Sequence, residues 1–192
     1  MSFDRGKLAE LVSRALIRSD DPIRLSSGDW SHDYIDGKRA LAPGEILAFA
    51  CNAVISRADE LGATFDAVGG LTMGADPIAH GVALLAGATW FSIRKELKPH
   101  GNPKLVEGAE LSSSSRVLLV DDIVTTGSSI LTAFDAIKAM APEVVLAIAL
   151  VDRGETARRR LTAQGVPYEP LLTYRDLEID PVGGISPLVR PS

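Results

Sequence analysis

The chain is poor in cysteine and has no excess of basic residues. Cys51 is the single cysteine among 192 residues, which excludes an intramolecular disulfide framework. It lies in an apolar segment with helical periodicity, so we expect its side chain to pack in the core. A single cysteine is also consistent with a protein of the reducing cytoplasm. Lysine and arginine total 20 against 25 aspartates and glutamates, a net charge of -5, which gives no support to a nucleic-acid-binding surface.

Long apolar runs are also missing. No run approaches the roughly 20 residues that a membrane-spanning helix requires, and the opening MSFDRGKLAE lacks the apolar core of a signal peptide. We therefore expect a soluble cytoplasmic protein with no membrane partner and no nucleic-acid partner. The length of 192 residues and the hydrophobic content of 46% suit one domain spanning residues 1–192.

Apolar periodicity alternates between helix and strand through most of the chain. It predicts helices over residues 4–18, 42–61, 76–85, 128–140 and 155–164, and strands over residues 65–70, 89–95, 117–122 and 143–153. Between the first two helices, strand-like pieces at 23–25 and 34–35 flank a run of turn formers, which indicates a hairpin-like element. This alternation predicts an α/β fold with a central, mostly parallel sheet flanked by helices.

Residues 96–115 form a polar stretch with no repeating apolar period, a length typical of a lid or of disorder. At its start, FSIRKELKPHGN gathers four cationic side chains, Arg94, Lys95, Lys98 and His100. Ordinary surface charge would explain two of these four. Cations on a mobile segment also neutralise the charge of a departing diphosphate, and closure of such a segment excludes water.

The stretch VDDIVTTGSS, residues 120–129, combines two acids with a phosphate-binding pattern. Asp121 and Asp122 come at the carboxyl end of a predicted buried strand, where open parallel sheets bind ligands. TTGSS then opens a helix, with hydroxyl donors, an N-terminus that favours an anion, and Gly127 to let successive N–H groups face one concavity. Because no Gly-Lys-Ser/Thr sequence is present, this is not the P-loop of nucleotide triphosphatases.

A ribose phosphate would satisfy both halves of this stretch. A carboxylate is repelled by a phosphate that it touches, but one sugar away it can accept hydrogen bonds from hydroxyls or help to hold a divalent cation. Two alternatives stay open for Asp121 and Asp122. They could be turn and helix-capping residues, or the acid pair of a response-regulator receiver domain, although that pair belongs near an N-terminus.

The sequence VLLVDDIVTTGSS resembles the motif with which type I phosphoribosyltransferases bind 5-phosphoribosyl 1-diphosphate (PRPP). The resemblance implies the type I phosphoribosyltransferase fold, with a small N-terminal hood element at about 20–40 and a flexible lid loop at about 96–115. It implies catalytic roles for Lys98, His100, Asp121 and Asp122, with the two acids on the ribose hydroxyls. The PRPP-binding residues that it implies are Arg94, Lys95, Lys98, His100, Asp121, Asp122, Ile123, Val124, Thr125, Thr126, Gly127, Ser128 and Ser129.

Within that superfamily, RKELKPHG is similar to the RKExKxHG motif of orotate phosphoribosyltransferases. SSGDWSHDYIDGKR, GGLTMGADP and LVDRGE resemble their hood element, diphosphate loop and base-binding segment. The resemblance implies Mg2+-dependent transfer of phosphoribose from PRPP to orotate, giving orotidine 5'-phosphate and diphosphate in pyrimidine biosynthesis. It implies that Arg153 and Thr125 contact orotate, that Mg2+ is held mainly by PRPP with no direct protein ligand assigned, and that residues 94–101 act on the neighbouring site of a homodimer.

Two positions depart from the family pattern. Ser26 stands where many bacterial members have a lysine that contacts both substrates. Either no residue replaces that lysine here, or Lys38 or Arg39 does. Met73 replaces a basic residue of the diphosphate loop, although backbone amides there could still bind diphosphate. A type I enzyme for another base and a PRPP-sensing regulator without turnover stay open as alternatives, and Arg153 could instead be a surface arginine at a helix start.

Overall fold

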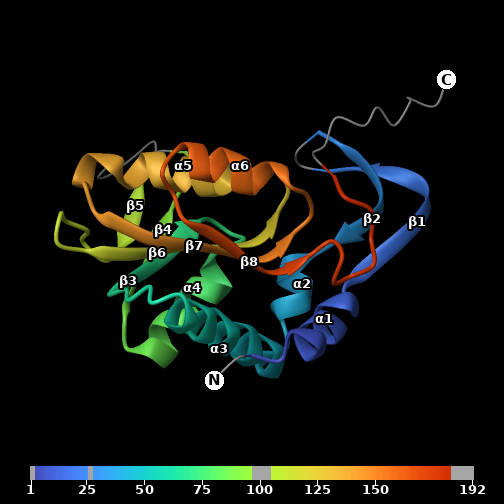
Figure 1. The fold of residues 1–192 in the computed structure, drawn as a ribbon, viewed down its shortest axis with the longest axis horizontal. Helices are drawn as coiled ribbons and strands as arrows, with labels where there is room; N and C mark the ends of the chain where they lie inside the picture. Colours follow the sequence, from blue (N-terminus) through green and yellow to red (C-terminus); the bar gives the residue numbers. More distant parts are fainter. Residues whose placement is uncertain (1–2, 26–27, 97–104, 183–192) are drawn as a thin grey trace.

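The computed structural model describes residues 3–25, 28–96 and 105–182, and a six-stranded sheet forms its centre (Figure 1). The strand order is β5-β4-β3-β6-β7-β8, and all neighbours pair in parallel except β4 and β5. The strands are β3 Ala67–Leu71, β4 Thr89–Ile93, β5 Val106–Gly108, β6 Arg116–Val124, β7 Glu143–Asp152 and β8 Tyr168–Thr173. The predicted central, mostly parallel sheet is therefore confirmed.

Helices cover both faces of the sheet (Figure 1). One face carries α3 (Gly44–Glu60) and α4 (Asp76–Ala86), and the other carries α5 (Ser128–Ile137), its short continuation η1 (Lys138–Met140) and α6 (Thr156–Ala163). Within β6, Leu118 and Val120 face the first layer while Val117 and Leu119 face the second. Burial on both faces explains why this strand is an unbroken apolar run, and each such side chain contributes about 1.5–3 kcal/mol. No helix in the described ranges is both long and apolar enough to cross a bilayer.

A separate antiparallel hairpin, β1 (Leu16–Arg24) with β2 (Trp30–Ile35), lies between α1 (Arg5–Ser13) and α2 (Gly37–Leu41). The predicted hairpin is therefore present, but the helix predicted over residues 4–18 is wrong beyond Ser13. Leu16 fits the helical spacing, yet it pairs with Ile35 as the first residue of β1. The conformation of Leu16 is decided by this long-range pairing, which a local apolar period does not reveal.

Two strands of the sheet were not expected from the sequence pattern. β5 lies inside residues 96–115, for which no regular structure was predicted, and its three residues are too few to show a period. β8 contains Pro170, which has no N–H to donate to a ladder, so its segment does not read as a strand. Its place at a sheet edge is where proline is tolerated.

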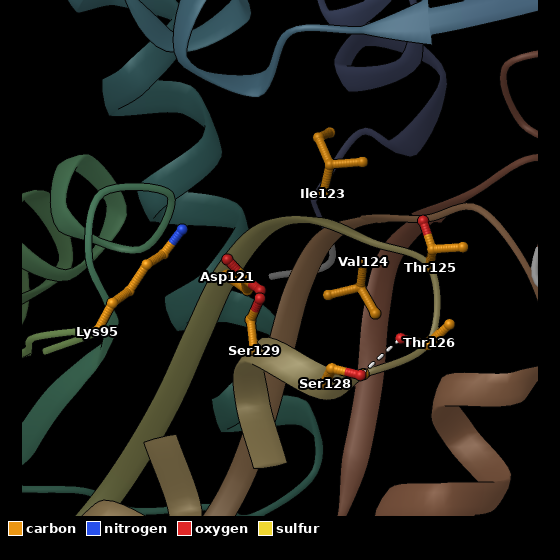
Figure 2. A pocket seen from close by; sticks show the side chains of 9 residues that line it. Lys95, Asp121, Ile123, Val124, Thr125, Thr126, Ser128 and Ser129 are labelled. Carbon is orange, nitrogen blue, oxygen red and sulfur yellow. Dashed lines mark hydrogen bonds between the residues drawn. The ribbon is translucent and has the colours of Figure 1, made fainter. Parts of the chain in front are cut away.

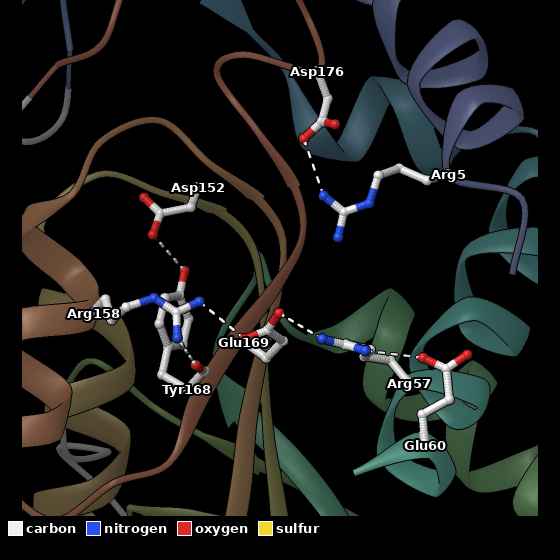
Figure 3. A network of polar contacts seen from close by, with 8 residues as sticks. All are labelled: Arg5, Arg57, Glu60, Asp152, Arg158, Tyr168, Glu169 and Asp176. Carbon is white, nitrogen blue, oxygen red and sulfur yellow. Dashed lines mark hydrogen bonds and ion pairs between the residues drawn. The ribbon is translucent and has the colours of Figure 1, made fainter. Parts of the chain in front are cut away.

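Glu169 of β8 joins the two helical layers across this edge of the sheet (Figure 3). Its carboxylate accepts a hydrogen bond from Arg57 of α3 at 2.8 Å and another from Arg158 of α6 at 2.9 Å. Beside it, the buried Tyr168 hydroxyl donates to Asp152 at 3.0 Å. The partly buried ion pairs each contribute about 1 kcal/mol, whereas the buried hydrogen bond of Tyr168 fixes the end of β7.

Candidate active site

A cavity of about 340 Å³ opens beyond the carboxyl end of β6 (Figure 2). Its lining residues are Lys95, Asp121, Ile123, Val124, Thr125, Thr126, Gly127, Ser128 and Ser129. All nine belong to the set for which PRPP binding was predicted, so the structure brings most of that set together. The cavity also lies at the edge where open parallel sheets bind ligands.

The loop of residues 125–129 carries the chain from β6 into α5. Gly127 has a φ of +75°, a left-handed conformation that L side chains rarely adopt, and a Cβ there would lie 3.3 Å from Ala157 of α6. The hydroxyls of Thr126 and Ser128 lie 2.8 Å apart. Because α5 begins at Ser128, its first N–H groups have no intrahelical acceptor and give this end of the cavity a partial positive charge.

Asp121 and Asp122 lie within β6, which continues past them to Val124, and they are only 4% and 8% exposed. Asp121 accepts a hydrogen bond from the amide of Asp122 at 3.0 Å, and Asp122 accepts one from the amide of Ile123 at 2.8 Å. The alternative that they cap the next helix is wrong, because α5 has Gly127 at its N-cap and no side-chain cap bond.

The electrostatics of this pair favour a bound proton. Burial, and secondly the charge of Asp122, raise the pKa of Asp121 to about 8, while Lys95 opposes the rise. Figure 2 shows the Lys95 ammonium directed toward Asp121. A ligand that presents hydroxyl donors or a cation would restore the ionised form of Asp121.

Two glycines let other parts of the chain approach the acids closely. A Cβ on Gly37, the first residue of α2, would lie 2.6 Å from a carboxylate oxygen of Asp122. A Cβ on Gly74, in the loop between β3 and α4, would overlap Asp122 and lie 2.9 Å from Asp121. The loop predicted to bind diphosphate therefore packs directly on the two acids, and Met73 of this loop is 67% exposed.

The four cationic residues predicted to bind PRPP differ in their position relative to the cavity. Lys95 lines the cavity of its own chain, which differs from the prediction that residues 94–101 act on the neighbouring site. Arg94 does not, because its Nε forms an ion pair with Glu107 of β5 at 3.0 Å. Lys98 and His100 lie outside the described residues, so their predicted roles stay predictions.

Arg153 follows β7 and is 1% exposed, so the alternative of a surface arginine is wrong. Its guanidinium donates to the carbonyl of Asp33 at 2.9 Å and to the hydroxyl of Ser31 at 3.1 Å, and so joins the main sheet to the hairpin. Within the described part of the chain its Nε–H has no acceptor. Burial lowers the pKa of Arg153, while the charge of Asp33 raises it. Arg153 does not line the cavity beside β6.

The two candidates for the role of the missing lysine, Lys38 and Arg39, are both exposed on α2. The Lys38 ammonium lies 3.8 Å from the carboxylate of Asp36. Neither side chain lines the cavity, and Ser26 lies outside the described residues. The structure therefore assigns this role to neither.

Sequence reasoning missed one residue that contacts the 125–129 loop. Arg160 of α6 donates a hydrogen bond to the carbonyl of Thr126 at 2.8 Å and another to the hydroxyl of Ser128 at 2.9 Å. It stands in the run Arg158-Arg159-Arg160, which reads as a charged helix face and belongs to no motif. Only the packing of α6 beside α5 reveals the contact.

Comparisons with known proteins agree with this geometry. The phosphoribosyl transferase domain family matches residues 39–164. An orotate phosphoribosyltransferase of Mycobacterium tuberculosis is 40% identical over 182 residues, covering 92% of this chain and 98% of the relative. One from Corynebacterium glutamicum is 38% identical over 180 residues, covering 92% of this chain and 95% of the relative.

Solved structures agree in the same way. That of Mycobacterium tuberculosis orotate phosphoribosyltransferase in complex with 5-phospho-alpha-D-ribosyl 1-diphosphate has a TM-score of 0.75 and 34% identity, covering 91% of this chain and 99% of that chain. The sheet, the acid pair and the loop after β6 thus define a phosphoribosyltransferase, an enzyme of type I fold. By sequence and structure together, the chain belongs to the orotate phosphoribosyltransferase family, as its motifs predicted.

Proposed function

We propose that the protein catalyses the Mg2+-dependent transfer of the 5-phosphoribosyl group from PRPP to N1 of orotate, in the cytoplasm and for pyrimidine biosynthesis. The products are orotidine 5'-phosphate and diphosphate. The observation that carries the proposal is the cavity beside β6, because eight of its nine lining residues belong to the PRPP motif and the ninth, Lys95, was also predicted to bind PRPP. The names of the curated relatives, at 38% and 40% identity, support orotate as the acceptor.

In this proposal the two halves of the cavity bind different parts of PRPP. The 125–129 loop and the N-terminus of α5 bind the 5-phosphate. Asp121 and Asp122 accept hydrogen bonds from the ribose hydroxyls, which favours the ionised form of Asp121. The sugar separates the phosphate from the carboxylates and so keeps like charges apart.

The residues present fit a magnesium ion that PRPP brings with it. Two buried carboxylates supply the oxygen donors that Mg2+ prefers, and loss of the proton favoured by Asp121 would make that residue available. The described residues contain no group of three or more His, Cys, Asp or Glu side chains able to hold a metal, so further oxygens would come from PRPP and water. When bound, Mg2+ neutralises charge on the diphosphate.

The protein mainly positions the substrates and stabilises the leaving group. The bond from the anomeric carbon to diphosphate oxygen breaks ahead of the new bond, through an oxocarbenium-like state, and diphosphate leaves with the electron pair. Lys95, together with Lys98 and His100, neutralises the charge that develops on it. The N1 lone pair of orotate then forms the glycosidic bond, and because orotate presents a deprotonated nitrogen, proton abstraction is secondary.

Orotate is held by Thr125 and Arg153 in the proposal. Thr125 lines the cavity, and Arg153 keeps one buried N–H without an acceptor among the described residues. A buried donor in this state costs free energy until a ligand accepts from it. The orotate carboxylate is a suitable acceptor because arginine binds carboxylates in a fixed planar geometry.

Base specificity can be tested by incubating the protein with PRPP, Mg2+ and one candidate base at a time. Consumption of orotate is followed by loss of its ultraviolet absorbance, and nucleotide formation is followed by chromatography. The proposal requires turnover of orotate. Consumption of another base with orotate left intact overturns the choice of substrate, and binding of PRPP by calorimetry with no turnover of any base identifies a regulator.

We also propose a homodimer in which the lid of one subunit acts on the other. Four exposed apolar side chains, Met73, Leu84, Leu85 and Trp90, lie on α4, on β4 and in the loop before α4. The ring of His80 contacts Trp90 with centroids 4.5 Å apart, and Leu84 follows His80 by one helical turn. Trp90 belongs to β4, the strand that leads into the lid segment, so a second copy bound there would lie beside the strand that precedes that segment.

Complementation tests whether the lid acts in trans. Lys98→Ala and Asp122→Asn are each expected to lower turnover by more than about tenfold, because one removes a lid cation and the other a cavity acid. A hybrid dimer would carry one site with both changes and one site with neither. Mixing the unfolded variants in equal amounts and refolding them should therefore restore about a quarter of wild-type activity. Activity no greater than the mean of the separately refolded variants would show that the lid acts in cis.

Gly74→Ala is expected to lower kcat/KM for PRPP about tenfold, because the added Cβ displaces the carboxylates of Asp121 and Asp122. Steady-state kinetics measure the effect. Gly44→Ala, where no atom lies within 4 Å of the added Cβ, is the control and should leave kcat/KM unchanged. Equal kinetics for both variants would show that the loop before α4 does not fix the acids.

A further inference from the structure

Helix α6 supports the 125–129 loop from outside the cavity. A Cβ on Gly127 would lie 3.3 Å from Ala157 and 3.5 Å from Leu161, so the loop rests directly on this helix. Arg160, one helical turn after Ala157, makes the two hydrogen bonds to Thr126 and Ser128. Residues one turn apart on a helix share a face, so α6 turns a single face to the loop.

The contact with Arg160 decides how the Ser128 hydroxyl can be used. A hydroxyl has one hydrogen to donate and two lone pairs that accept. Since Arg160 has no acceptor to offer, the Ser128 oxygen must accept from it, which directs its hydrogen away from α6. That hydrogen can point to Thr126, 2.8 Å away, or to a ligand in the cavity. Arg160 therefore helps to orient a donor of the loop while lying outside the cavity lining.

We propose that Arg160 is a positioning residue for the 5-phosphate of PRPP. Its bond to the Thr126 carbonyl fixes the backbone of the loop, and its bond to Ser128 sets the direction of a phosphate donor. Its permanent positive charge also lies one hydrogen bond behind that donor, where it favours a dianionic group. The inference rests on the proposed function, because it assigns the 125–129 loop to the phosphate of PRPP.

The neighbouring arginines provide the comparison. Arg158 is engaged elsewhere, with the carbonyl of Tyr168 and with Glu169. Arg159 makes no hydrogen bond or ion pair within the described residues, although it has the same charge and belongs to the same helix. Since successive helical residues point about 100° apart, removing the charge of Arg159 leaves the loop contacts intact. Arg159→Gln is therefore a matched control for Arg160→Gln.

The test measures binding of the two ends of PRPP separately, with one ligand for each end. Binding of ribose 5-phosphate and of magnesium diphosphate is measured by calorimetry on the full-length variants, alongside KM and kcat. Arg160→Gln should lower the affinity for ribose 5-phosphate and raise the KM for PRPP, each by about tenfold. Its kcat and its affinity for magnesium diphosphate should stay within about twofold of wild type. In Arg160→Lys, which keeps the charge, the ribose 5-phosphate affinity and the KM for PRPP should lie within about threefold of wild type. In Arg159→Gln both values should match wild type.

Three results would overturn the role of Arg160. They are unchanged binding in Arg160→Gln, an equal loss in Arg159→Gln, and a parallel loss of ribose 5-phosphate and diphosphate affinity. The last would mean that α6 only supports the fold, and a fall in melting temperature would accompany it. Failure of the wild-type protein to bind PRPP in the presence of Mg2+ is a different outcome, because it overturns the proposed function itself.

Discussion

Asp121→Asn is expected to make the ligand-free protein more stable and much less active. Burial and the charge of Asp122 raise the pKa of Asp121 from 3.8 to about 8, so between these values the folded protein binds more protons than the unfolded chain. The stability that the bound proton provides is complete below the unfolded pKa and is lost as pH rises through the folded pKa. Asparagine keeps the oxygen that accepts from the Asp122 amide and removes the ionisation.

The melting temperature of Asp121→Asn should therefore exceed that of wild type by about 3 °C at pH 8, and by less at pH 5. In kinetics, kcat/KM for PRPP should fall about 100-fold, because the proposed function places the Asp121 carboxylate on the ribose hydroxyls. The control is Asp135→Asn, which removes the same charge from an exposed site on α5. A lower melting temperature for Asp121→Asn at pH 8 would contradict the assignment of a buried proton to this residue.

Arg153→Met is expected to remove orotate use while leaving PRPP binding and the fold nearly intact. The change deletes two hydrogen bonds to the hairpin, but it also removes a buried charge whose Nε–H has no acceptor among the described residues. These effects oppose one another, so the melting temperature should change by less than about 3 °C. In the proposed function Arg153 binds the orotate carboxylate, so its loss should lower kcat/KM for orotate about 100-fold.

Calorimetry should show PRPP affinity in Arg153→Met within about threefold of wild type, because Arg153 does not line the cavity beside β6. Ser31→Ala is the matched control, since it removes one hairpin partner of Arg153 and leaves the arginine in place. It should leave orotate kinetics nearly unchanged. Equal losses of PRPP and orotate affinity in Arg153→Met, together with a much lower melting temperature, would make Arg153 an anchor of the hairpin only.

The parts that the sequence predicted well are those that local pattern determines. The apolar run of β6 requires burial on both faces, and the turn at Gly127 followed by hydroxyl residues requires a helix N-terminus beside a strand end. Local sequence pattern therefore predicted four strands of the main sheet, β3, β4, β6 and β7, and the loop that lines the cavity. The same reasoning missed β8, because Pro170 breaks the strand pattern and only pairing with β7 reveals it.

The contacts that the sequence did not reveal join segments that are distant in the chain. Arg153 could be read as a surface arginine because its partners, Ser31 and Asp33, lie on the hairpin more than a hundred positions earlier. Arg160 belongs to no motif because its role comes from the packing of α6 beside α5. Gly37 and Gly74 reach Asp122 from two different segments, and their spacing in the chain does not show that they meet.

The two edges of the central sheet limit how this protein can associate with other molecules. In the described part of the chain, one edge is β5, only three residues long. The other is β8, where Pro170 interrupts the backbone donors and Glu169 is held between two arginines. Neither edge is a good template for intermolecular strand addition, the commonest route to fibrils. In the proposed homodimer, two copies that meet through the exposed apolar side chains of α4 would therefore have no sheet edge among the described strands from which a continuous intermolecular sheet could grow.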